Sequence, residues 1–181
     1  MNKLHLGCGP KVFPGWINCD IAPAEKIPAD LRQYYRRLDL SAPLPFENDS
    51  ADLIYSEDFI EHFEQSLVML MLVEQHRVLK PEGTVRISTP SLAYWMAPEK
   101  MRERGGGIVS YHDFFKLVQT HWLQFRHKLL FTPQFLKETL EMVGFRDVIF
   151  VDCGKSAHPE LRGIDTRLEQ AASNIIIEAR K

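Results

Sequence analysis

Short apolar runs recur along the chain and are closed by glycine, proline or acidic residues, which is typical of strands that end in loops. The first run contains Leu4 and Leu6 and stops at the turn Gly7–Pro10. The next three runs end at or beside polar or acidic residues and span Trp16 to Cys19, Tyr35 to Leu40 and Ala51 to Ser56. The first third of the chain therefore predicts a series of short strands.

Helical periodicity replaces this pattern twice. Ser66 to Leu79 predicts one helix with Ser66 as its N-cap, and Thr132-Pro133 opens a second helix that Gly144 ends. Further strands are expected at Thr84 to Thr89, Val148 to Val151 and Ile175 to Ala179. Strands that alternate with helices favour a Rossmann-like α/β fold, in which helices flank a mostly parallel, seven-stranded sheet.

The stretch from Pro90 to Phe131, after the fifth strand, departs from this alternation. It contains eight aromatic residues and the run Gly105–Gly107. We interpret residues 90–131 as a helical, aromatic insertion within a single domain of residues 1–181, and we expect it to form a lid over an acceptor. His112, His121 and His127 belong to it. Packing of the aromatic side chains against the sheet is the alternative use of the same composition.

Composition disfavours several classes of protein. A net charge of −2 gives no overall attraction to nucleic acid or an anionic membrane, and the longest apolar run, Leu67 to Val73, has only seven residues. Three cysteines do not make a disulfide framework, so we expect a reducing cytoplasm. The histidines and cysteines show no spacing typical of a metal site, and no metal is expected.

The turn after the first strand is suited to a ligand, because Gly7 and Gly9 allow close approach to the backbone. A dinucleotide fingerprint needs a small residue where this chain has Val12, and a helix N-terminus facing the pyrophosphate. Pro10 and Pro14 make a full helix unfavourable at this point. The loop therefore favours S-adenosylmethionine, which has no phosphate and carries a positive sulfonium.

Two acidic residues follow the glycine loop at successive strand ends. Asp20 is placed to accept hydrogen bonds from the two ribose hydroxyls. Asp39 is placed to accept from the adenine amino group, while the backbone N–H of Leu40 donates to a ring nitrogen. Either acid alone could simply cap a strand end, but all three features meet at the carboxyl edge of one sheet, where such folds bind ligands.

These residues also carry a family resemblance. Leu4–Pro10 and Pro14–Asp20 resemble the opening of the class I S-adenosylmethionine-dependent methyltransferases, in a compact branch similar to methyltransferase type 11. The segments Leu38–Tyr55, Ile60–Phe63 and Val78–Thr84 are similar to the motifs that follow in that family. The resemblance covers nearly the whole chain except the insertion.

The resemblance implies S-adenosylmethionine as cofactor and methyl transfer as activity. By this resemblance, the residues that bind the cofactor are Gly7, Cys8, Gly9, Asp20, Ile21, Asp39, Leu40, Ser56 and Glu57. Asp20 follows Gly9 by only eleven residues, where the ordinary spacing is about 20, so the first helix is cut away. Either the insertion or a partner chain, including a second copy in a homo-oligomer, remains available to complete the pocket.

His62 is the first candidate for a general base that removes a proton from the acceptor, although a histidine there could equally cross-link the loop. The family suggests a small-molecule or saccharide-type acceptor. Two alternatives remain at this stage. One is a non-catalytic subunit that binds S-adenosylmethionine for regulation or scaffolding; the other is a nicotinamide-dependent oxidoreductase, which Val12 disfavours.

Overall fold

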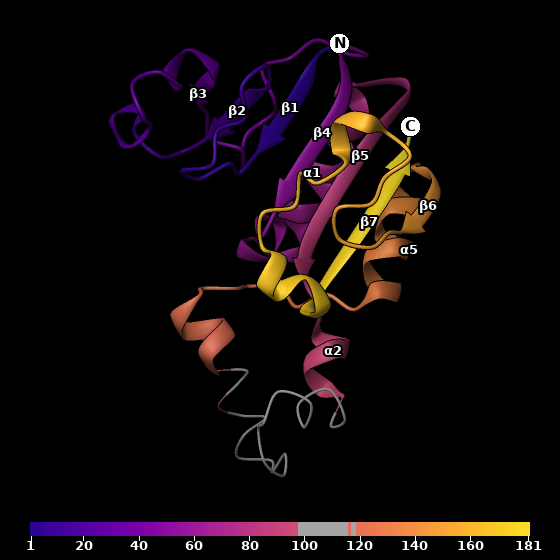
Figure 1. Ribbon diagram of the computed structural model, residues 1–181. Coiled ribbons are helices and arrows are strands. Elements are labelled where there is room, and N and C mark those ends of the chain that lie inside the picture. The colour runs from indigo at the N-terminus through magenta and orange to yellow at the C-terminus, as the bar shows by residue number, and fades with distance from the viewer. Residues whose placement is uncertain (98–115, 117–118) are drawn as a thin grey trace.

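A computed structural model describes residues 1–97, 116 and 119–181, and its centre is a seven-stranded sheet (Figure 1). The strand order is β3-β2-β1-β4-β5-β7-β6. The strands are β1 (Lys3–Leu6), β2 (Ile17–Asp20), β3 (Tyr35–Arg37), β4 (Ala51–Glu57), β5 (Leu79–Pro90), β6 (Arg146–Phe150) and β7 (Asn174–Arg180). The predicted mostly parallel, seven-stranded sheet is confirmed.

The register of the first strands brings their carboxyl ends together. Leu4 of β1 pairs with Ile17 on one side and with Ile54 on the other, and all three strands run parallel. β5 continues this direction beside β4, whereas β7 runs antiparallel to both β5 and β6. β3 is shorter than predicted. The backbone N–H of Leu38 donates to the carbonyl of Asp20, and the chain then turns away from the sheet at Asp39.

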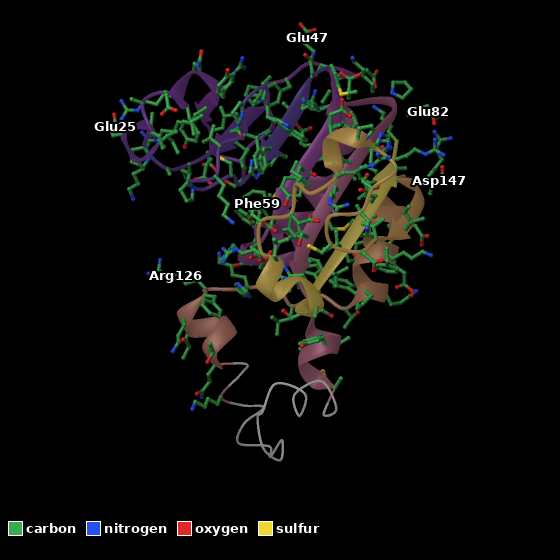
Figure 2. The ribbon with its side chains drawn as sticks, viewed as in Figure 1. Glu25, Glu47, Phe59, Glu82, Arg126 and Asp147 are labelled. Carbon is green, nitrogen blue, oxygen red and sulfur yellow. The ribbon has the colours of Figure 1, made fainter. Side chains whose placement is uncertain are left out.

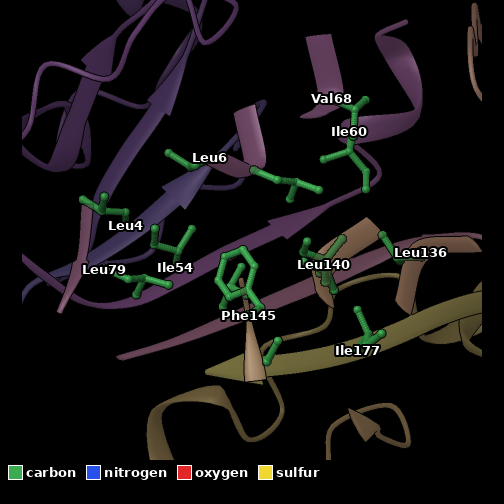
Figure 3. Close-up of a cluster of buried hydrophobic side chains, with 14 of the residues drawn as sticks. Leu4, Leu6, Ile54, Ile60, Val68, Leu79, Leu136, Leu140, Phe145 and Ile177 are labelled. Carbon is green, nitrogen blue, oxygen red and sulfur yellow. The ribbon is translucent and has the colours of Figure 1, made fainter. Parts of the chain in front are cut away.

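Two helices, α1 (Gln65–Val78) and α5 (Pro133–Val143), pack on the same face of the sheet and enclose the main core (Figure 3). The predicted caps of α5 are confirmed, because the Thr132 hydroxyl accepts from the N–H of Phe135 and Gly144 is left-handed with φ 112°. The predicted N-cap Ser66 is wrong. Helix α1 already begins at Gln65, and Glu64 precedes it without a side-chain cap.

The other face of the sheet is covered without a long helix in the described part of the chain. Trp16 and Tyr55 pack there with Leu161 and Ile164, which belong to the segment between β6 and β7. In Figure 1 this segment crosses in front of the central strands, and it contains the 3-10 turn η5 (Pro159–Leu161). The shortened connection between β1 and β2 has no helix, as the prolines predict.

A buried ion network fastens this C-terminal segment to the sheet. The Arg86 guanidinium on β5 is completely buried and donates to both carboxylate oxygens of Asp165, at 3.0 and 2.5 Å. It also donates to Glu178 on β7 at 2.5 Å and to the carbonyl of Lys155 at 2.9 Å. The buried positive charge of Arg86 is therefore compensated by two carboxylates, and its N–H groups donate to oxygen atoms, as a buried charge requires.

The described ends of the predicted insertion contain the short helix α2 (Leu92–Met96) and a π-helical turn, η4 (Thr120–Gln124). Gly105–Gly107 and His112 lie outside the described residues, so the lid remains a prediction. The remaining 3-10 turns are η1 (Ala24–Lys26), η2 (Arg32–Tyr34), η3 (Ile60–His62) and η6 (Leu168–Ser173). No helix among the described residues has both the length and the apolar character that crossing a membrane requires.

Candidate cofactor cleft and active site

The glycine turn follows β1 directly and bends the backbone in a way that favours glycine. Gly7 and Gly9 have φ of 70° and 51°, and the N–H groups of Gly7 and Cys8 both donate to the carbonyl of Cys19. A Cβ atom on Gly7 would lie 2.2 Å from the ring of Phe59. A Cβ atom on Gly9 would meet nothing within 4 Å, so this glycine leaves open space beside the loop.

Asp20 ends β2 and closes the glycine loop. Its two carboxylate oxygens accept from the N–H groups of Gly9, at 2.8 Å, and Ala22, at 2.9 Å. Each oxygen keeps a further lone pair for a ligand hydroxyl. Ile21, the next residue, is 62% exposed, which is high for a large apolar side chain.

Six of the predicted site residues line one cleft of about 310 Å³: Gly7, Cys8, Gly9, Asp20, Glu57 and His62. The other lining residues are His5, Pro10, Lys11, Asp58, Phe59 and Arg167. The thiol of Cys8 packs inward, and burial raises its pKa to about 12. Cys8 therefore offers its backbone to the cleft and not a reactive thiolate.

A second, apolar pocket of about 200 Å³ adjoins this cleft. Leu40 lines it, and Phe59, which is labelled in Figure 2, lines both spaces. Asp39 is exposed and lines neither space; its carboxylate accepts from the backbone and hydroxyl of Ser41. Those bonds, first of all the one from the hydroxyl, lower the pKa of Asp39.

Ser56 and Ile21 also lie outside the lining of both spaces. Ser56 is only 1% exposed, and its hydroxyl has no hydrogen-bond partner among the described residues. Its position at the end of β4 is adjacent to Glu57, which does line the cleft. The structure thus brings six of the ten predicted residues to the cleft, Leu40 to the neighbouring pocket, and places three at their periphery.

Comparison with known proteins finds similarity to methyltransferases. Residues 4–87 match the family model described as a methyltransferase domain. An S-adenosylmethionine-dependent methyltransferase from Mesorhizobium loti aligns with 24% identity over 99% of this chain and 90% of that chain, with a TM-score of 0.66. The matched segment and the shared fold are those of S-adenosylmethionine-dependent methyltransferases, and S-adenosylmethionine is the cofactor that this similarity implies.

Other solved methyltransferases share the fold. One from Archaeoglobus fulgidus is 18% identical over 99% of this chain and 86% of that chain, with a TM-score of 0.63. The Haemonchus contortus phosphoethanolamine N-methyltransferase 2, solved with phosphomonomethylethanolamine and S-adenosylhomocysteine, is also 18% identical, over 100% of this chain and 48% of that chain, with a TM-score of 0.61. No curated protein sequence matches this chain.

The geometry of the cleft fits S-adenosylmethionine. Gly9 leaves its side-chain position open, and Asp20 keeps lone pairs for hydroxyls. An apolar pocket adjoins this polar cleft, as a ligand with a polar amino-acid end and a flat nucleobase requires. Because no helix follows β1, no helix N-terminus with its partial positive charge faces the cleft at this point. Such a terminus would repel the positively charged sulfonium.

Sequence reasoning missed the part of the cleft that the C-terminal segment supplies. The carboxylate of Glu57 accepts from the N–H groups of Thr166, at 3.0 Å, and Arg167, at 3.1 Å, and from the Thr166 hydroxyl. Arg167 also pairs with Asp58 at 3.1 Å. These contacts join residues more than 100 positions apart, so no local sequence motif predicts them.

His5 is a second omission, since its position inside the first strand suggests only packing. Its ring stacks on Phe13 at 4.6 Å, and its Nδ1 lies 3.1 Å from the side-chain oxygen of Asn18. Burial lowers the pKa of His5 to about 4, so the ring is neutral at physiological pH.

His62, the predicted base, lies at the end of η3 and lines the cleft as expected. Burial lowers the pKa of its imidazole, while hydrogen bonds with the main chain of Arg126 and Asp58 act in the opposite direction. A neutral ring is the form required both of a proton acceptor and of a metal ligand. The side chain of His121, another histidine of the insertion, lies outside the described residues.

Proposed function

We propose that this methyltransferase holds S-adenosylmethionine across the glycine cleft and the neighbouring apolar pocket, and transfers its methyl group to a small-molecule acceptor. The observation that carries the proposal is the convergence of Gly9, Asp20 and Glu57 on one cleft at the carboxyl edge of the sheet. Parallel α/β sheets bind their ligands at this edge.

Each residue has a distinct task in this proposal. Asp20 accepts hydrogen bonds from the ribose hydroxyls, and the Gly7–Gly9 backbone lies against the methionine portion. Leu40 and Phe59 contact the adenine, with Ile21 and Asp39 at the outer side of the ring and Ser56 beside the methyl-bearing end. A bound S-adenosylmethionine supplies an activated methyl group. The task of the chain is then to align the acceptor and exclude water.

The walls of the cleft support a polar acceptor. Besides the predicted residues, they contribute Lys11, Asp58 and Arg167, which offer both hydrogen-bond donors and acceptors. Hydroxyl-rich molecules need such a mixture, and a saccharide-type acceptor is therefore the narrower form of the proposal. The solved relative bound to phosphomonomethylethanolamine shows that a small polar molecule suits a methyltransferase of the same fold.

Calorimetric titration with S-adenosylmethionine and S-adenosylhomocysteine tests the cofactor site. Asp20→Ala should weaken binding at least tenfold, because two hydrogen bonds to a charged acceptor are lost and each contributes about 1.5–3 kcal/mol. Asp30→Ala is the matched control, since Asp30 is exposed and lies outside the cleft lining. Equal affinity in both variants would refute the proposed orientation of the cofactor.

The acceptor is then sought by measuring S-adenosylhomocysteine formation with mono- and disaccharides, amines and phenols. Turnover with saccharides supports the narrower proposal, whereas turnover with amines alone contradicts it.

The single-domain organisation, the lid formed by residues 90–131 and a homo-oligomeric state belong to the same proposal. Action in a reducing cytoplasm is supported by the three free cysteines, Cys8, Cys19 and Cys153.

A further inference from the structure

Three side chains capable of binding a metal meet beside the cleft. Glu61, His62 and His127 each offer one ligand atom, and these atoms lie within 4.8 Å of one another. The two imidazole rings are 5.0 Å apart, centre to centre, and nearly perpendicular. Donors around a tetrahedral ion with bonds of about 2.1 Å lie about 3.4 Å apart, so modest side-chain rotations would close the site.

The carboxylate of Glu61 provides an independent reason to look for a ligand. The side chain is 1% exposed, and its Oε1 has no hydrogen-bond partner among the described residues. The other oxygen, Oε2, accepts from the Thr89 hydroxyl at 2.9 Å, which fixes the orientation of the carboxylate. A buried carboxylate oxygen without a partner is costly unless something binds it.

The fold holds His127 at this place through backbone hydrogen bonds. The N–H groups of Lys128 and Leu129 both donate to the carbonyl of Glu61, at 2.7 and 3.1 Å. Phe131, further along the same segment, forms a parallel bridge to Ser91, which directly follows β5. The contact between His127 and the η3 turn is therefore part of the framework of the protein.

We propose that Glu61, His62 and His127 form a binding site for a divalent transition-metal ion at the edge of the cofactor cleft. Two imidazoles and one carboxylate select borderline ions such as Zn²⁺, Co²⁺ or Fe²⁺ over Mg²⁺, which prefers oxygen ligands. Thr89 acts as the outer partner that orients the carboxylate. Three protein ligands leave a coordination position open.

The location gives the ion a use in methyl transfer. Because His62 lines the cleft, an acceptor hydroxyl can complete the coordination, where the ion lowers its pKa so that its proton passes to a water molecule. His62 then serves as a ligand, and the ion takes over its predicted task of activating the acceptor. This use rests on the proposed function, whereas ion binding itself does not.

The test is titration of the chelator-treated full chain with Zn²⁺ in the absence of S-adenosylmethionine. We expect saturable binding of about one equivalent, a visible Co²⁺ spectrum without a thiolate band, and no comparable affinity for Mg²⁺. Glu61→Gln and His127→Ala should each weaken Zn²⁺ binding at least tenfold, and Thr89→Val about tenfold. His158→Ala is the control, because it removes an imidazole that bonds to Thr84 outside the cluster.

Absence of saturable Zn²⁺ and Co²⁺ binding by the folded wild-type chain would overturn the proposal, as would unchanged Zn²⁺ affinity in Glu61→Gln and His127→Ala. If a ligand variant fails to fold, the wild-type stoichiometry, the Co²⁺ spectrum and Thr89→Val still decide. Zn²⁺ binding by a chain that does not bind S-adenosylmethionine would refute the proposed function and leave the metal site standing.

Discussion

Two regions of this molecule bury acidic side chains in different ways. Asp165 and Glu178, each 4% exposed, share the guanidinium of Arg86 and have oxygens bonded to it at 2.5 to 3.0 Å. Glu61 is 1% exposed, has a single donor in Thr89, and keeps one oxygen unpartnered. Burial consequently raises the pKa of Glu61 to about 8.

The difference separates a structural task from a binding task. The Arg86 network satisfies its acids within the chain and fastens the C-terminal segment over the sheet. The Glu61 cluster is incompletely satisfied and lies beside the cleft. Polar groups that the chain itself does not satisfy are the ones prepared for a ligand.

Arg86→Met should destabilise the protein by about 3–5 kcal/mol, because it leaves two buried carboxylates without their cation. Chemical denaturation measures the change. Arg36→Met is the control, since Arg36 is exposed. A loss below about 1 kcal/mol would mean that the network is accessible to water and does not fasten the C-terminal segment.

His5 makes stability sensitive to acid. Its pKa is about 4 in the folded protein and near 6.5 when unfolded, so the unfolded chain takes up a proton first as the pH falls. Stability should decline by up to about 3 kcal/mol between pH 6.5 and pH 4. His5→Asn keeps a donor toward Asn18 and removes the titration, so its unfolding free energy should change less over this range. Equal slopes would contradict the assignment.

Glu178→Gln and Glu61→Gln compare the two regions directly. The first should cost about 2 kcal/mol, because Arg86 loses a charged hydrogen-bond partner. The second should cost less than about 1 kcal/mol in metal-free protein, since Glu61 has only the Thr89 hydroxyl to lose. Thermal or urea unfolding of both variants measures the difference, and a reversed order would remove the distinction between the two regions.

Much of the fold is readable from local patterns. The strands, the capped helix after Thr132 and the missing helix between β1 and β2 all follow from short-range features such as Gly144 and Pro10. The Ser66 prediction fails because the helical hydrogen bonds begin earlier: the N–H groups of Leu67 and Val68 both donate to the carbonyl of Glu64. Glu64 to Ser66 are all exposed, so packing does not explain this earlier start.

The site is predictable only in part. Gly9 and Asp20 can be predicted because they are close in sequence, and the structure shows a hydrogen bond between them. Thr166 and His127 carry no such signal, since both reach the cleft region through contacts with residues far away in the chain. The same distance explains why no metal-type spacing is visible: His127 follows His62 by 65 positions.

The position of β7 has a consequence for how the protein is made. β7 lies between β5 and β6 and pairs with both, and Glu178 within it completes the Arg86 network. The segment that matches the methyltransferase family therefore emerges from the ribosome long before its sheet can close. During synthesis the sheet therefore remains incomplete until β7 has been made, and the Arg86 network can form only after Glu178 has emerged.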